Sequence, residues 1–85
     1  MQSNKGHKRG SIDGLNQHRL ETLGAFLKHY RQNQLLSRKE LESQHGISKG
    51  ILERLESGQN ITLHSLLRIM DVFMLSPQDV FEGIE

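Results

Sequence analysis

The stretch Ser37–Gly58, SRKELESQHGISKGILERLESG, decides the fold because it places helix-start signals on both sides of a glycine. Ser37 and Glu40 are spaced as a capping box, in which each side chain accepts a hydrogen bond from the other residue's backbone N–H. Gly46 readily adopts the left-handed conformation that ends a helix, and Ser48 is a suitable N-cap for the next one. The pattern predicts two short helices joined by a three-residue turn.

Helical patterns continue on both sides of this stretch. Upstream, apolar side chains three or four residues apart form one stripe, and downstream Ser76-Pro77 is a strong helix start. The expected helices cover about 18–33, 38–45, 49–57, 63–74 and 77–83. In the fourth of these, the inward face is expected to hold Leu63, Leu66, Met70 and Phe73. Since no segment alternates apolar and polar residues for long, we expect an all-α fold.

The composition fits one small domain and excludes several classes of site. The chain has 85 residues, 34% hydrophobic content, a net charge of +1 and no cysteine, which excludes disulfides and thiolate metal sites. The five histidines are too far apart in sequence for a local metal pair, and no phosphate-binding loop occurs. We therefore expect no enzyme, cofactor or metal. Without an apolar run of about 20 residues or a signal-peptide core, a cytosolic protein is expected.

The charge is unevenly distributed along the chain. Residues 1–19 carry four basic residues against one acid, and the first 14 residues contain three glycines. Such a segment buries too little apolar area to offset the entropy of ordering its backbone. We therefore expect a flexible basic arm at 1–17 before a folded domain at 18–85. The arm is either a terminus without a role or a segment that binds a polyanion.

The segment Leu23–Phe81, about 59 of the 85 residues, resembles the Xre family of Cro- and lambda-repressor-like helix-turn-helix DNA-binding domains. The positions that carry the resemblance are Leu23, Gly24, Leu27, Arg31, Ser37, Leu41, Gly46, Ile47, Ser48, Leu52, Leu55, Glu56, Gly58, Leu63, Leu66, Ile69 and Phe73. The resemblance implies a five-helix lambda-repressor-like domain with its helix-turn-helix at about 37–57. It also implies a structural ion pair between Arg31 and Glu56.

Four positions depart from the family pattern. Arg38 replaces a glutamine, Glu42 a small alanine, and His45 an apolar residue. Glu42 must tilt outward or find a partner, and its spacing allows it to pair with His45 on one helix face. Gly50 stands where a polar base-reading residue is common, and it costs about 1 kcal/mol of helix stability relative to alanine.

The outward face of the 49–57 helix is expected to read base edges in the major groove, through Lys49, Gly50, Glu53 and Arg54. Lys49 and Arg54 can donate to guanine O6 and N7, and Glu53 can accept from cytosine N4. Phosphate contacts are expected at the start of the preceding helix and in the turn that follows residue 57. The residues expected to make them are Ser37, Arg38, Ser57, Gln59 and Asn60.

These features favour a sequence-specific transcriptional regulator, such as a repressor, the antitoxin of a toxin–antitoxin operon, or a mobile-element or phage regulator. Its expected partners are a palindromic double-stranded DNA operator, a second copy of the chain and, for an antitoxin, a cognate toxin. Its expected location is the nucleoid in the cytoplasm of a bacterium or of a phage host. Apolar residues beyond the needs of the core predict a dimer or partner surface at Phe26, Met74, Phe81 and Ile84.

One alternative stays open, a protein-interaction module that kept the helix-turn-helix fold and lost specific DNA binding. Gly50, Glu53 and the nearly neutral net charge favour it, whereas the basic N-terminal segment opposes it.

Overall fold

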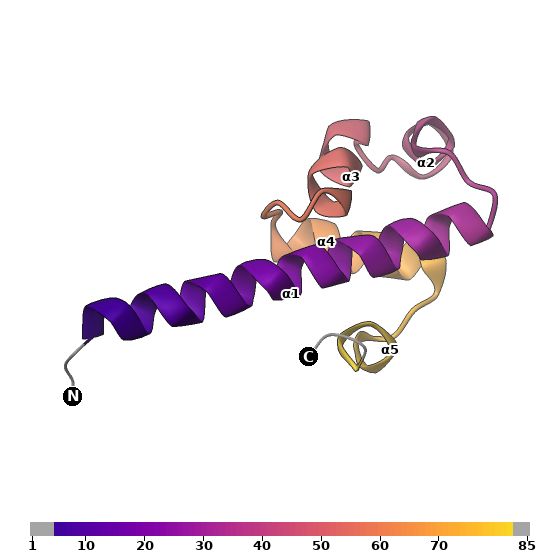
Figure 1. Cartoon of the computed structure of the whole chain (residues 1–85). Helices are drawn as coiled ribbons and strands as arrows, with labels where there is room; N and C mark the ends of the chain where they lie inside the picture. The colour runs from indigo at the N-terminus through magenta and orange to yellow at the C-terminus, as the bar shows by residue number, and fades with distance from the viewer. Residues whose placement is uncertain (1–4, 83–85) are drawn as a thin grey trace.

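The computed structural model describes residues 5–82, with side chains from residue 14 onward, and this part of the chain is helical without a strand. The helices are α1 (Lys5–Asn33), α2 (Arg38–His45), α3 (Lys49–Glu56), α4 (Leu63–Phe73) and α5 (Pro77–Phe81). Figure 1 shows α1 running past all the others, with α2 and α3 on one side of it and α5 on the other. The predicted all-α class and five helices are confirmed.

Helices α2 to α5 begin at the residues that the sequence predicted, because each start is fixed by a local cap. The side chains that accept a backbone N–H at these starts are those of Ser37, Ser48, Thr62 and Ser76. Ser76 and Asp79 form a second capping box ahead of α5. Three of the four helices end one or two residues before the expected position, which is the usual uncertainty at a helix end.

The core lies where α1 crosses α3 and α4. Gly24 permits a close approach of α1 to α3, since a Cβ there would lie 2.0 Å from the carbonyl oxygen of Leu55. At the other end of the contact, the rings of Tyr30 and Phe73 lie 5.4 Å apart and join the C-terminal ends of α1 and α4. The buried apolar side chains are Leu23, Leu27, Leu41, Ile47, Leu52, Leu55, Leu66, Ile69, Met70, Phe73 and Val80.

Helix α1 begins at Lys5 and not near residue 18, so the predicted boundary between arm and helix is wrong. Arg19 donates a hydrogen bond to the side-chain oxygen of Asn16 (3.2 Å). Gln17 Nε2 donates to Glu21 Oε2 (3.2 Å) and across to the carbonyl oxygen of Gly58 (3.1 Å). These polar contacts hold residues 16–21 of α1, which include Asn16 and Gln17 from the end of the expected arm. Residues 1–4 of the expected arm lie outside the described residues.

Leu63 is a second correction, because the sequence pattern places it on the core face and its side chain is 67% exposed. The buried stripe of α4 is centred on Leu66, Ile69 and Phe73, which recur every three or four residues. Leu63 opens the helix at the edge of that stripe, one turn before α4 reaches the core.

Candidate nucleic-acid interface

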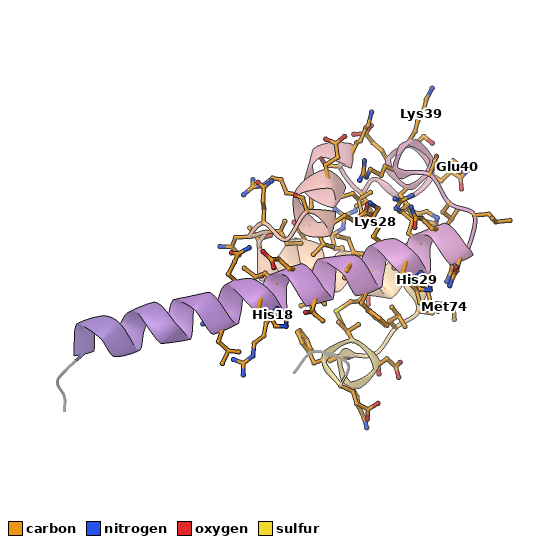
Figure 2. All side chains as sticks on the ribbon, viewed as in Figure 1. His18, Lys28, His29, Lys39, Glu40 and Met74 are labelled. Carbon is orange, nitrogen blue, oxygen red and sulfur yellow. The ribbon has the colours of Figure 1, made fainter. Side chains whose placement is uncertain are left out.

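The start of α2 is held by the predicted capping box. Ser37 Oγ accepts a hydrogen bond from the backbone N–H of Glu40 (3.0 Å), and Glu40 Oε1 accepts one from the backbone N–H of Ser37 (2.8 Å). The backbone N–H of Ser37, and then its side chain, hold the pKa of Glu40 below the ordinary value of 4.5. Lys39 projects away from the body of the molecule (Figure 2). This end of α2 is therefore rigid and open to a ligand.

The turn between α2 and α3 is closed by local and distant hydrogen bonds. Gly46 has a φ of 69°, in the left-handed region, and the backbone N–H of Ile47 donates to the carbonyl of Leu41 (3.2 Å). Arg68 reaches over from α4 and donates from Nη2 to the carbonyls of His45 (3.3 Å) and Gly46 (3.5 Å). These bonds satisfy carbonyl groups that the end of α2 leaves free.

Two side chains cap the start of α3. Ser48 Oγ accepts a hydrogen bond from the backbone N–H of Ile51 (3.4 Å). Glu42 Oε2, from α2, accepts one from the backbone N–H of Lys49 (3.1 Å). Within the described residues, Glu42 thus pairs across the turn and not with His45, as its spacing had allowed. The first turn of α3 is bound to α2 by a charged group, which also suits the positive end of the helix dipole.

Arg31, Glu56 and Arg38 form a cluster that joins α1, α2 and α3. Arg31 donates from Nε to Glu56 Oε2 (2.7 Å) and from Nη2 to Oε1 (3.0 Å), and its Nη1 donates to the carbonyl of Leu36 (2.8 Å). Arg38 donates from Nε to the same Oε1 (3.1 Å). The Glu56 side chain is only 2% exposed. The ion pair implied by the resemblance is therefore present and is shared with a second guanidinium.

The four residues expected to read bases lie on one surface of α3. Lys49, Gly50, Glu53 and Arg54 are all exposed, and at 100° per residue they span an arc of about 140°. Arg54 donates from Nη2 to the carbonyl of Asn60 (2.8 Å). Arg38 Nη1 lies 3.9 Å from Glu53 Oε2. Two of the charged side chains on this surface are therefore engaged with neighbouring groups of the protein.

The turn after α3 holds the second group of residues expected to contact phosphates. Ser57 Oγ donates to the carbonyl of Glu53 (2.9 Å), and Gln59 Nε2 donates to Ser57 Oγ (3.0 Å). A hollow of about 320 Å³ opens beside this turn and is lined by Ile51, Arg54, Asn60, Ile61, Thr62 and Ser65. Ser37 and Arg38 lie at the start of α2 instead, so the expected phosphate-binding residues form two groups.

The charge on this surface is nearly balanced. Its basic side chains are Arg38, Lys39, Lys49 and Arg54, and its acidic ones are Glu40, Glu42 and Glu53. Of the basic groups, only Arg38 forms an ion pair within the described part of the chain. Because phosphate contacts supply much of the affinity for DNA, the ammonium groups of the two lysines are the clearest free donors.

Two contributors to this surface were missed by sequence reasoning. Glu42 departs from the family pattern, but its partner Lys49 lies seven residues away across a turn. Arg68 bonds to residues 22 and 23 positions before it in the chain. No spacing rule connects positions so far apart, and only the packing of α4 on the turn brings Arg68 there.

The expected dimer or partner surface is only partly open. Phe26 is half-buried and packs on the core, with its ring 6.3 Å from that of Tyr30. Met74 is 89% exposed and closes α4 with a φ of 59°, and Phe81 is 43% exposed. Ile84 lies outside the described residues. Met74 lies at the end of the molecule where α1 and α4 finish (Figure 2), away from the N-terminal end of α1.

Two other kinds of site were searched for in the described part of the chain. No group of three or more His, Asp or Glu side chains there could hold a metal ion. None of its helices is both long and apolar enough to cross a membrane.

The capped α2, the left-handed turn and the exposed face of α3 define the class of this protein as a helix-turn-helix DNA-binding domain. A family model described as a helix-turn-helix domain matches residues 22–82, and the chain belongs to that family. The match confirms the helix-turn-helix prediction, while the narrower Xre assignment stays a prediction. Searches of curated proteins and of solved structures give no significant match.

Proposed function

We propose that this protein is a sequence-specific transcriptional regulator that binds double-stranded DNA by placing α3 in the major groove. The observation that carries the proposal is the exposed face of α3, which presents Lys49 in its first turn and Arg54 in its last turn, on a helix that is held at both ends. Glu42 and Ser48 hold the start of this helix, and Glu56 ties its end to two arginines. A fixed helix suits base reading, because the geometry of each contact is set before binding.

Lys49 and Arg54 are the proposed readers of guanine, and Glu53 is a proposed acceptor for cytosine N4. Gly50 lets the DNA approach the backbone of the first turn. For Arg54, binding exchanges the carbonyl of Asn60 for an acceptor on the DNA. The contact raises affinity for DNA only where the hydrogen bond from Arg54 to the DNA is stronger than the one to the Asn60 carbonyl that it replaces.

The proposed phosphate-binding residues are Ser37, Arg38, Ser57, Gln59 and Asn60. Arg38 keeps donor capacity while bound to Glu56, since a guanidinium carries five N–H groups. Its phosphate contact and its ion pair are therefore compatible. Ser37 lies at the N-terminus of an eight-residue helix, where free N–H groups favour an anion.

A second copy of the chain is the proposed protein partner, through the exposed side chains of Met74 and Phe81 together with Phe26. Ile84, the fourth residue of the expected surface, lies outside the described residues. A two-fold dimer matches a palindromic operator with half-sites one helical turn apart. With this function the protein works at the nucleoid in the cytoplasm. More specific roles are repression by promoter occupancy, an antitoxin role with a cognate toxin, and control of a phage, mobile-element or restriction operon. The neighbouring genes distinguish these roles.

The experiment is a binding-site selection with the wild type, Lys49→Ala, Arg54→Ala and Arg38→Ala. Each α3 variant is expected to relax the preference at one position per half-site, with a loss of about 1–3 kcal/mol on the preferred site. Arg38→Ala is expected to weaken all sequences alike. Lys28→Ala removes a positive charge from an exposed position on α1 and is the matched control. Unchanged preference and affinity in both α3 variants would remove the support for α3 as the recognition helix.

A protein-interaction module is the second candidate function. The observation that favours it is the nearly neutral charge of the α3 surface, where Glu42 and Glu53 offset Lys49 and Arg54. A titration of random-sequence DNA at several salt concentrations separates the two candidates. A regulator shows binding that weakens steeply with salt, whereas an interaction module shows no binding at low salt.

A further inference from the structure

Glu42 belongs to α2, but its carboxylate lies at the first turn of α3. Oε2 accepts the backbone N–H of Lys49 at 3.1 Å, and the side chain is exposed. Among the hydrogen bonds within residues 14–82, none uses Oε1. One oxygen is therefore fixed, and the other offers a free acceptor beside the residues proposed to read bases.

The first turn of α3 is open at Gly50, which has no side chain. A Cβ built at Gly50 would meet only Ser48 Oγ, at 3.7 Å. The position that commonly carries a base-reading side chain thus leaves room in front of the α3 N-terminus. A base edge can approach the first turn there more closely than it could past a longer side chain.

An ionised carboxylate only accepts hydrogen bonds, so it distinguishes between base edges. In the major groove, cytosine offers a donor at N4, whereas guanine and thymine offer acceptors at the corresponding places. Adenine offers a donor at N6 beside an acceptor at N7, which repels the carboxylate. Cytosine is therefore the base that this group favours.

We propose that Glu42 is a specificity-determining residue that selects a cytosine at one position of each half-site through Oε1. The proposal rests on the proposed function, since it assigns a further reader to the same DNA-binding surface. The hydrogen bond to Lys49 keeps the carboxylate oriented before DNA arrives, so little side-chain entropy is lost on binding.

The test is a binding-site selection with Glu42→Gln beside the wild type. Glutamine keeps an oxygen for the N–H of Lys49, and its Nε2 then faces the base as a donor, which suits an acceptor such as guanine O6 or thymine O4. We expect one position per half-site to lose its preference for cytosine in favour of a base with an acceptor at that place, with about a tenfold or larger change in relative affinity. Glu82→Gln makes the same change in net charge at an exposed position just after α5, which lies across α1 from α3 (Figure 1), and is the matched control.

A purely structural cap predicts a different result, in which Glu42→Gln selects the wild-type sequence with equal or uniformly lower affinity. That result would overturn the role of Glu42 and leave the proposed function standing. A wild type that enriches no sequence would instead overturn the proposed function, and the role of Glu42 with it.

A second measurement leaves the protein unchanged, in case Glu42→Gln does not fold. Each cytosine of the selected site is replaced in turn by 2-pyrimidinone, which lacks the N4 amino group. We expect this replacement at one cytosine to weaken binding by the wild type about tenfold. Binding by Glu53→Gln should be weakened equally at that cytosine, which would show that Glu53, the other exposed acid of the surface, is not the group in contact with it. Wild-type affinity that is insensitive at every cytosine, or a loss that Glu53→Gln abolishes, contradicts the proposal.

Discussion

Arg38 donates a hydrogen bond from Nε to Oε1 of Glu56 over 3.1 Å, which joins the first residue of α2 to the last residue of α3. The same oxygen accepts from Nη2 of Arg31 at 3.0 Å. The two helices of the DNA-binding unit are thus fixed to each other and to α1 at one buried carboxylate.

Because Glu56 binds both arginines, substitutions of the cluster residues should reduce the free energy of unfolding by unequal amounts. Glu56→Ala leaves the buried guanidinium of Arg31 without its carboxylate, and we expect a loss of about 3–5 kcal/mol in the free energy of unfolding. Arg38→Ala should cost about 1 kcal/mol or less, because its side chain is 31% exposed and Glu56 keeps Arg31. Urea unfolding of both variants and of the double variant checks the prediction, and equal costs would contradict it.

Gly24 and Gly14 make a matched pair on α1. Gly24→Ala places a methyl group against the carbonyl of Leu55, so α1 and α3 must separate, with an expected loss of about 1–3 kcal/mol or more. A Cβ at Gly14 would point into open space, with no packing partner within 4 Å, and Gly14→Ala should raise the free energy of unfolding by up to about 1 kcal/mol. Thermal unfolding of the two variants should show shifts of opposite sign.

The capping box at Ser37 predicts a dependence of stability on pH. The pKa of Glu40 is below its ordinary value of 4.5 because the backbone N–H and side chain of Ser37 favour the charged form. A carboxyl with a lowered folded pKa stabilises the fold above its unfolded pKa, and this contribution is lost as the pH falls through the folded value. We therefore expect stability to fall below about pH 4.5.

Glu40→Gln keeps the shape of the box but removes the titration, so its stability should fall less in the same range. Asp79→Asn tests the second box, where the backbone N–H and side chain of Ser76 lower the pKa of Asp79. Urea unfolding at several pH values measures both effects. A pH dependence identical to that of the wild type in both variants would rule out these carboxyls as its source.

The basic N-terminal segment is expected to add affinity for DNA without specificity. The triple change Lys5→Gln, Lys8→Gln and Arg9→Gln removes three positive charges, and it should flatten the slope of log K against log salt by roughly 2–3. The preferred site should stay the same. Lys28→Gln is the single-charge control on the same helix. An unchanged slope in the triple variant would show that the segment does not contact the DNA phosphates.

The sequence by itself determined the helix starts and the helix-turn-helix, because these depend on neighbours in the chain. Ser37 with Glu40, and Ser76 with Asp79, satisfy backbone groups three residues away, so their effect is visible in the spacing. The left-handed turn at Gly46 is likewise a local preference of glycine. The pairing of Arg31 with Glu56 was available only through resemblance to a family.

Only the tertiary structure decided how the candidate DNA-binding surface is held. Arg38 on Glu56, Arg68 on the α2–α3 turn and Glu42 on the backbone of Lys49 all join residues from different helices. Gln17 likewise ties the outer part of α1 to the domain by bonding to Gly58, 41 residues away. A side chain finds such partners only after the core has packed, since packing sets the distances between helices and local sequence does not.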